Sequence, residues 1–171
     1  EQKQKYLPSM CRGIVIGAHG MSEPDSGSDA YSLRTNAERC TGGYILNGTK
    51  TFVTNAPIAD LALVFATVDP SKGMWGITGF LVEADTPGFS ISRDIEKMGL
   101  RTSPMAELIF QDCFIPTENR LGPEGAGAGI FNSSMEWERS CILASHIGAM
   151  ERQLEQCVQY ARERQQFAQP I

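Results

Sequence analysis

The most informative stretch of this chain is a polar loop, Met21-Ser22-Glu23-Pro24-Asp25-Ser26-Gly27-Ser28-Asp29. It follows an apolar run over 13–18 that is typical of a strand. Pro24 stiffens the turn and removes a backbone donor, and Gly27 allows a close backbone approach. Because small residues let backbone N–H groups point at a ligand, the loop fits an oxygen-rich, phosphate-bearing ligand. An ordinary polar turn is the alternative.

The composition bounds the class of protein. A chain of 171 residues is long enough for one core, and its hydrophobic content of 42% argues against disorder. No run approaches the roughly 18 apolar residues of a membrane-spanning helix. The net charge of −5 argues against a nucleic-acid partner. The first residues lack an initiator Met and the apolar core of a signal peptide, so we expect an excised piece of a longer protein.

The thiols and imidazoles indicate the compartment rather than a metal. The 5 cysteines show no CxxC spacing, and His19 and His146 lie far apart, so no metal site is expected. Unpaired thiols favour a reducing compartment. We expect a cytoplasmic protein, or a mitochondrial-matrix protein if the source is eukaryotic.

Short strands and turns fill the region from Cys11 to about Leu121, which predicts a β-barrel or sandwich. Before it, residues 1–6 resemble the tail of a helix that Pro8 breaks. Asn47-Gly48 is the strongest local hairpin signal and predicts a turn after Tyr44–Leu46. The other expected strands are 60–68, 76–82, 89–92, 107–110 and 113–115.

A glycine-rich hinge over 122–129 marks a change of pattern. From near Ala128 to near Gln165, apolar residues recur at three- and four-residue steps, which predicts one long amphipathic helix. Such a helix would be about 50 Å long. It cannot bury its apolar stripe against one small barrel, so we expect further helices from missing sequence or from another chain.

Three more motifs accompany the loop. They are Asn47-Gly48-Thr49-Lys50-Thr51-Phe52-Val53-Thr54-Asn55, then Lys97-Met98-Gly99-Leu100-Arg101 leading to 110–116, and Tyr160-Ala161-Arg162-Glu163-Arg164-Gln165-Gln166-Phe167. In this order and spacing, the four motifs resemble the acyl-CoA dehydrogenase family of flavoproteins. The resemblance covers nearly the whole chain.

The resemblance implies a fold that is mainly β with α. It predicts the family's middle-domain β-barrel followed by one long helix of a helical bundle domain. The implied divisions are the end of an N-terminal helical domain over 1–10, an FAD- and substrate-binding barrel over 11–122, and the start of the C-terminal helical domain over 123–171. The family also implies a homodimer or homotetramer.

FAD is the cofactor that the resemblance implies. Met21 and Ser22 would contact the isoalloxazine edge, Phe52 would stack near the ring, and Thr54 would bond near N5. Packing in the core is the alternative for the aromatic residues. Arg164, Gln166 and Phe167 match the segment that reaches the FAD of a neighbouring subunit, and Ala168 replaces the glycine that often follows. The full cofactor set is Met21, Ser22, Gly27, Ser28, Phe52, Val53, Thr54, Arg164, Gln166 and Phe167.

The expected catalytic base is Glu138. On a helix it shares a face with Phe131, Met135 and Ile142, so it is either a salt-bridged structural residue or a base. Isovaleryl-type and long-chain-type members of the family place their base on this helix directly before an arginine, which favours the catalytic role. Most of the family place it far down the C-terminal domain, and a base in that region is the alternative. The implied substrate-binding residues are Ser28, Ser92, Arg93, Glu136 and Arg139.

The resemblance implies α,β-dehydrogenation of an acyl-CoA, with electron-transfer flavoprotein or oxygen as the electron acceptor. Some relatives act instead on an acyl or aminoacyl group carried by a carrier protein, and the Met135–Arg139 run is compatible with them. Others are flavin oxidases or monooxygenases. A non-catalytic binding or assembly fragment is the alternative from another class.

Overall fold

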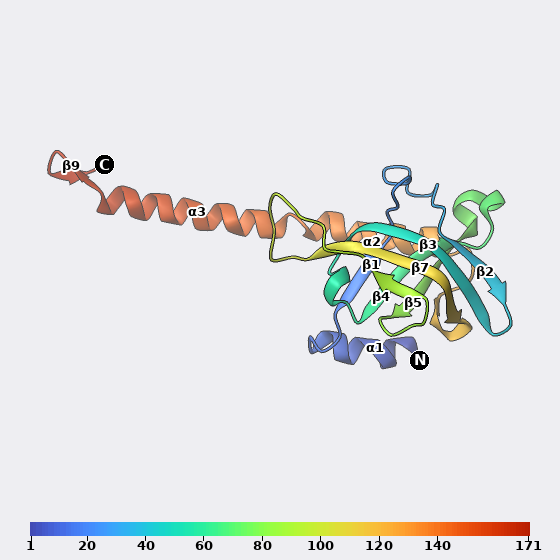
Figure 1. The fold of residues 1–171 in the computed structure, drawn as a ribbon. Coiled ribbons are helices and arrows are strands. Elements are labelled where there is room, and N and C mark those ends of the chain that lie inside the picture. Colours follow the sequence, from blue (N-terminus) through green and yellow to red (C-terminus); the bar gives the residue numbers. More distant parts are fainter. The chain divides into compact units, whose positions relative to one another are not determined.

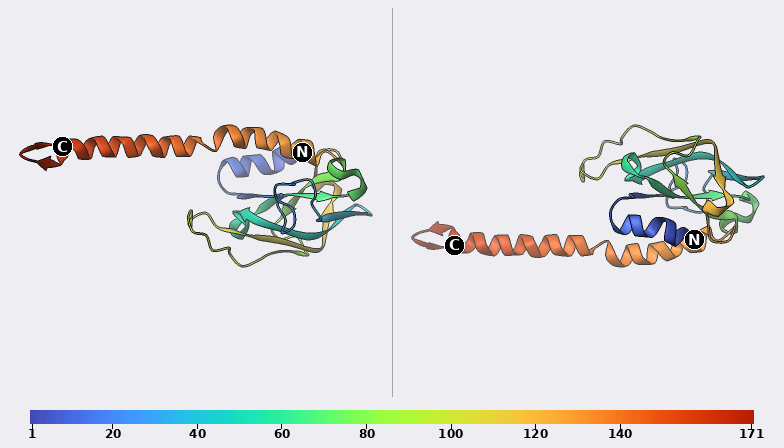
Figure 2. Two further views of the ribbon diagram at one scale, coloured as in Figure 1. Left: turned by 90° about the horizontal axis from the view of Figure 1, so that it is seen from above. Right: turned by 90° about the horizontal axis from the view of Figure 1, so that it is seen from below.

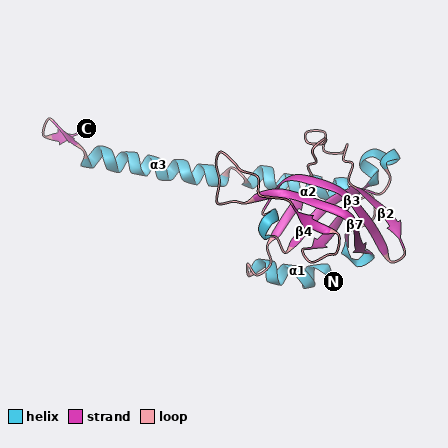
Figure 3. Ribbon diagram, in the orientation of Figure 1, coloured by secondary structure: helices cyan, strands magenta, loops and turns pink.

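The computed structural model describes residues 1–171 and divides them into two compact units, Glu1–Ile130 and Phe131–Ile171. The first unit is mainly β and the second is helical (Figures 1 and 3). The prediction of a β-rich domain followed by helix is therefore confirmed. None of the helices combines the length and the apolar character that crossing a bilayer requires.

Eight strands of the first unit form one mixed sheet. Its path runs β6-β7-β3-β2-β4-β5-β8, and β1 pairs in parallel with β4. The path ends at two short edge strands, β6 and β8, so the sheet is open where the sequence predicted a barrel. The strands are β1 (Gly17–Gly20), β2 (Asn36–Cys40), β3 (Gly43–Thr54), β4 (Leu61–Thr67), β5 (Ile77–Glu83), β6 (Phe89–Ile91), β7 (Met105–Pro116) and β8 (Arg120–Leu121).

Apolar side chains from these strands form the core. The largest cluster joins β3, β4, β5 and β7, and Leu46, Phe80 and Phe110 are among its buried members. Tyr44 meets Phe80 edge to face, with ring centroids 5.0 Å apart. Three short 3₁₀ helices connect strands: η1 (Ala56–Ile58), η2 (Pro70–Gly76) and η3 (Thr117–Asn119).

The chain begins with helix α1 (Gln2–Cys11), which lies beside the strands (Figure 2). The expected break at Pro8 is wrong, because the helix continues through it. Tyr6 packs with Leu61 and Leu81 and donates a 2.7 Å hydrogen bond to Glu83, so tertiary contacts offset the lost backbone bond. The strand expected over 13–18 begins only at Gly17, since residues before it cap this helix: the amides of Ile14 and Val15 both bond to the Ser9 carbonyl.

The turn expected at Asn47-Gly48 is also wrong. Both residues lie inside β3, where the pairing with β7 shifts register between Leu46 and Gly48. Gly48 has φ +146°, and a Cβ there would lie 2.6 Å from the Thr35 hydroxyl oxygen. The glycine therefore serves a bulge and a close approach rather than a hairpin.

The predicted helical stretch forms two helices, α2 (Gly127–Cys141) and α3 (Ala144–Glu163), with an interruption at 142–143. After α3, the short strands β9 (Gln165–Gln166) and β10 (Gln169–Pro170) form a hairpin. Its two turn residues, Phe167 and Ala168, have φ +53° and +57°. Both residues therefore adopt the left-handed conformation of a type I′ turn, which normally favours glycine or asparagine.

Candidate functional site

The loop that the sequence singled out lies against strand β3. The Lys50 ammonium donates to the Met21 carbonyl oxygen at 3.1 Å, and the Thr51 amide donates to the Ser22 carbonyl oxygen at 2.9 Å. The loop closes on itself through two backbone bonds between Glu23 and Ser26. The structure therefore brings together two motifs whose bonded residues, Met21 and Lys50, are 29 positions apart in the sequence.

A buried carboxylate organises this junction. Glu23 accepts hydrogen bonds from the backbone amides of Arg34 and Thr35 and, at 2.7 Å, from the Lys50 ammonium. The Lys50 side chain is 0% exposed and that of Glu23 only 4%. One carboxylate thus joins the start of the loop, the segment that follows the loop, and β3.

Burial and pairing shift the ionisation of both groups. Burial lowers the pKa of Lys50 to about 8, although the negative charge of Glu23 and its hydrogen bond oppose this shift. Burial alone would raise the pKa of Glu23. The charge of Lys50 and the hydrogen bonds outweigh it, so the Glu23 pKa lies below its usual value. Near neutral pH the pair is therefore ionic.

A bulge in β3 presents the predicted flavin residues. The pairing with β7 shifts register between Lys50 and Val53, and Phe52 takes φ +55° there. The Phe52 side chain is 65% exposed, whereas Val53 is buried in the core. Phe52 and Thr54 therefore face outward beside the loop, and the Val53 side chain does not.

The exposed groups of this junction fit a flavin nucleotide. Ser28 and Thr54 are exposed and Ser22 is half-buried, so three hydroxyls stand ready to donate to or accept from polar ligand atoms. Gly27 is exposed, and a Cβ built on it would meet nothing within 4 Å. An exposed aromatic ring, small hydroxyl side chains and open space match an aromatic ring system that carries phosphates.

Two expected substrate-binding residues, Ser92 and Arg93, follow directly after β6. The Ser92 hydroxyl accepts from the Glu107 amide at 3.0 Å and donates to the Arg93 carbonyl oxygen at 3.0 Å. The Glu107 carboxylate in turn accepts from the Thr51 hydroxyl at 3.1 Å. Ser92 is thus linked through Glu107 to the bulge, while Arg93 is exposed.

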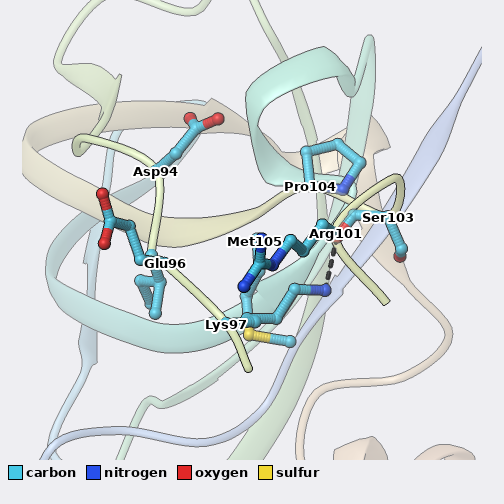
Figure 4. Close-up of a pocket in the computed structure, with 8 residues that line it drawn as sticks. Asp94, Glu96, Lys97, Arg101, Ser103, Pro104 and Met105 are labelled. Atoms are coloured by element: carbon cyan, nitrogen blue, oxygen red, sulfur yellow. Dashed lines mark hydrogen bonds between the residues drawn. The ribbon is translucent and has the colours of Figure 1, made fainter. Parts of the chain in front are cut away.

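The Lys97–Arg101 motif forms a loop around a pocket of about 420 Å³ (Figure 4). Asp94 and Glu96 line it together with Lys97 and Arg101, so the pocket carries both signs of charge. Lys97 donates to the Ser103 carbonyl oxygen, which holds the loop closed. None of the flavin residues expected from the sequence lines this pocket.

The remaining predicted residues belong to the second unit. Glu136, Glu138 and Arg139 are exposed on α2, and the Glu138 backbone carbonyl accepts from the Ile142 amide at 2.9 Å. Arg164 ends α3, and Phe167 is 97% exposed at the tip of the hairpin. Gln166 pairs with Gln169 in that hairpin. The roles of these residues stay predictions.

The Glu23–Lys50 pair was not predicted from the sequence, although Glu23 and Lys50 lie in two of the four motifs that carry the family resemblance. Lys50 stands in the middle of a strand and is a residue type that is almost never fully buried without a partner. A lysine near the middle of a strand that also carries Tyr44–Leu46 and Phe52-Val53 was the available signal. The sequence does not show which acid it meets, because that depends on how the loop folds back onto β3.

Two family models match this chain. "Acyl-CoA dehydrogenase, middle domain" matches residues 18–113, and "Acyl-CoA dehydrogenase, C-terminal domain" matches residues 125–171. The boundary between the two matches falls near the glycine-rich hinge.

Known proteins are similar over the whole chain. The structure of the prolyl acyl carrier protein oxidase AnaB is 54% identical with a TM-score of 0.94, covering 99% of this chain and 45% of that one. A structure described as PigA with FAD and proline is 45% identical to this chain, with a TM-score of 0.93. The match covers 99% of this chain and 44% of that one. The mitochondrial 2-methylacyl-CoA dehydrogenase of Solanum tuberosum is 44% identical, covering 100% of this chain. The chain spans 42% of the length of that relative.

Proposed function

Because this chain belongs to the acyl-CoA dehydrogenase family, we propose that the whole protein is an FAD-dependent oxidoreductase that dehydrogenates an acyl thioester between its α and β carbons. The observation that carries this proposal is the junction of the loop Met21–Asp29 with the bulged strand β3. This junction carries the exposed ring of Phe52 and the exposed hydroxyls of Ser28 and Thr54, which supports a flavin site there. The similarity to a structure that holds FAD supports the same cofactor here.

FAD, when bound, supplies an acceptor for a hydride, and this chain supplies its binding groups. Phe52 offers its ring, while Ser22, Ser28 and Thr54 offer hydroxyls. Arg164, Gln166 and Phe167 are proposed to reach the FAD of a neighbouring subunit. Such a role agrees with their exposure at the end of α3 and in the hairpin.

Glu138 is the proposed base. Loss of a proton from the α carbon requires a carboxylate that is held against that carbon. The exposure of Glu138 on α2 agrees with such a role. Glu136 and Arg139 lie beside it and are proposed to contact the substrate, as are Ser28, Ser92 and Arg93.

The second candidate is dehydrogenation or oxidation of an aminoacyl group on a carrier protein. The observation in its favour is the 54% identity to a prolyl acyl carrier protein oxidase, above the 44% identity to the 2-methylacyl-CoA dehydrogenase. Both candidates share the thioester and the proposed base. They differ in the acyl group and in whether CoA or a carrier protein carries it, and electron-transfer flavoprotein or oxygen is the proposed electron acceptor for both.

The test uses the full-length protein. We expect it to purify with bound FAD and its yellow colour to bleach when a thioester substrate is added without oxygen. Matched prolyl and short-chain acyl groups, each presented as the CoA thioester and on a carrier protein, separate the two candidates by kcat/KM. A protein that stays colourless after incubation with FAD would favour a non-catalytic binding or assembly role instead.

A further inference from the structure

We infer that the buried Glu23–Lys50 ion pair positions the residues that bind the flavin. The pair holds the loop residues Met21–Glu23 against β3 in the absence of FAD. The inference rests on the proposed function, since it concerns the same FAD site. Neither residue belongs to the set that the sequence predicted to touch FAD. Their role is to hold that set in one arrangement.

The contacts of Lys50 tie the start of the loop to the strand. Its ammonium donates to the Met21 carbonyl oxygen at 3.1 Å and to a Glu23 carboxylate oxygen at 2.7 Å. One residue further along β3, the Thr51 amide donates to the Ser22 carbonyl oxygen at 2.9 Å. Three consecutive loop residues are therefore bonded to two consecutive strand residues.

The contacts of Glu23 tie the far side of the loop to the same point. Its carboxylate accepts from the amides of Arg34 and Thr35, and the Thr35 carbonyl oxygen accepts from the Thr67 amide of β4 at 2.9 Å. Loss of the carboxylate would release the entry of the loop, its exit and Lys50 together. A neutral side chain cannot serve two backbone donors and an ammonium equally well.

The surrounding residues make room for this pair. A Cβ on Gly20 would lie 3.2 Å from the Lys50 Cγ, so the β1 residue beside the lysine stem must be small. The bulge begins directly after Lys50 and turns Phe52 outward at φ +55°. The ion pair therefore lies next to both the loop and the bulge that turns Phe52 outward.

Buried ion pairs often add little net stability, because removing two charges from water offsets much of their attraction. Replacing both partners by neutral groups of similar size is frequently tolerated, whereas removing one leaves an unpaired buried charge. Replacing both partners together therefore tests whether the ion pair positions the loop or only stabilises the fold. A double variant can keep the fold and still lose the exact placement of the loop.

The experiment uses full-length protein stripped of FAD and its Glu23→Gln/Lys50→Met double variant. The matched control is Asp25→Asn, which removes an exposed ion pair between Asp25 of the same loop and Arg34. The Asp25 side chain is 63% exposed and the Arg34 side chain 76%. We expect the double variant to remain folded, with one cooperative thermal transition, while its Kd for FAD rises at least about tenfold, the scale of one well-placed hydrogen bond. The bound-flavin spectrum should shift, and the control should behave like the wild type.

A folded double variant with the wild-type Kd and spectrum would overturn the inference. Amide exchange in the FAD-free wild type gives a second decision that needs no variant. We expect slow exchange at Arg34, Thr35 and Thr51, and rapid exchange at all three would show that the loop is not held before FAD binds. If the wild type itself binds no FAD, the proposed function fails. A wild type and a double variant that bind FAD equally well overturn only the inference about the ion pair.

Discussion

At the scale of single residues, the buried pair of Glu23 and Lys50 joins the loop Met21–Asp29 to β3. Met21, Ser22, Phe52 and Thr54 were predicted to share one site, and the structure places their segments side by side. The Glu23–Lys50 pair was not predictable, because a sequence does not show which acid a buried lysine meets. Val53 was expected among the flavin residues, yet its side chain lies in the core.

Gly48 offers a direct test of the corrected fold. We expect Gly48→Ala to lower the free energy of unfolding by about 1–3 kcal/mol, because alanine is strained at this φ and its Cβ would meet Thr35. Gly129→Ala is the control, since a Cβ there meets nothing within 4 Å and the position lies in α2. Urea denaturation of the full-length protein measures both. Equal stability of Gly48→Ala and the wild type would contradict the placement of Gly48 inside β3.

Glu23 predicts a specific acid sensitivity. Its folded-state pKa lies below the ordinary value of 4.5, so its stabilising contribution is complete above about pH 4.5 and is lost as the pH falls through the folded pKa. We expect the free energy of unfolding of the wild type to fall more steeply below pH 4.5 than that of Glu23→Gln. Asp25→Asn should follow the wild type. Parallel curves for wild type and Glu23→Gln would show that the carboxylate is not stabilised in the folded chain.

At the scale of elements, apolar runs predicted strands well. The expected strands 60–68 and 76–82 correspond to β4 and β5, because a buried strand needs apolar residues on both faces. Local breakers misled where tertiary contacts were stronger, as at Pro8 in α1 and at Asn47-Gly48 in β3. Two expected segments, 107–110 and 113–115, are parts of one continuous strand, β7.

The terminal hairpin carries a residue in an unfavourable conformation. Ala168 has φ +57° in the turn between β9 and β10, where glycine costs less. We expect Ala168→Gly to stabilise this hairpin by up to about 1 kcal/mol, seen as slower amide exchange at Gln169 in the full-length protein. Ala149→Gly in the exposed middle of α3 should have the opposite effect, with a loss of about 1 kcal/mol. Faster exchange at Gln169 in Ala168→Gly would argue against this turn.

At the scale of the whole molecule, α3 leaves its apolar stripe uncovered within this chain. Ile147, Met150 and Leu154 are all exposed large apolar residues of this helix. Such a stripe is typical of a surface that packs against other helices. The chain spans less than half of the length of these relatives, and we expect further helices of the whole protein or of another subunit to cover the stripe.

The assembly prediction concerns the end of this helix. We expect the full-length protein to be a homodimer or homotetramer in which Arg164 and Phe167 cover the FAD of a partner subunit. Arg164→Ala and Phe167→Ala should each raise the Kd for FAD by about tenfold, whereas Arg152→Ala, also exposed on α3, should not. Sedimentation gives the mass and fluorescence titration gives the Kd. A monomer that binds FAD normally would refute this arrangement.

We expect the full-length protein to dehydrogenate a thioester with Glu138 as base. The most direct test is single-turnover reduction of the bound flavin, without oxygen, in the wild type, Glu138→Gln and Glu151→Gln. Glu151→Gln is the control because it changes another exposed glutamate, on α3. We predict that the wild type and Glu151→Gln bleach rapidly, while Glu138→Gln keeps its FAD and reacts about 10²–10⁴-fold more slowly. Near-normal reduction in Glu138→Gln would assign the base to another residue, and no bleaching of the wild type by any thioester would contradict the expected dehydrogenation itself.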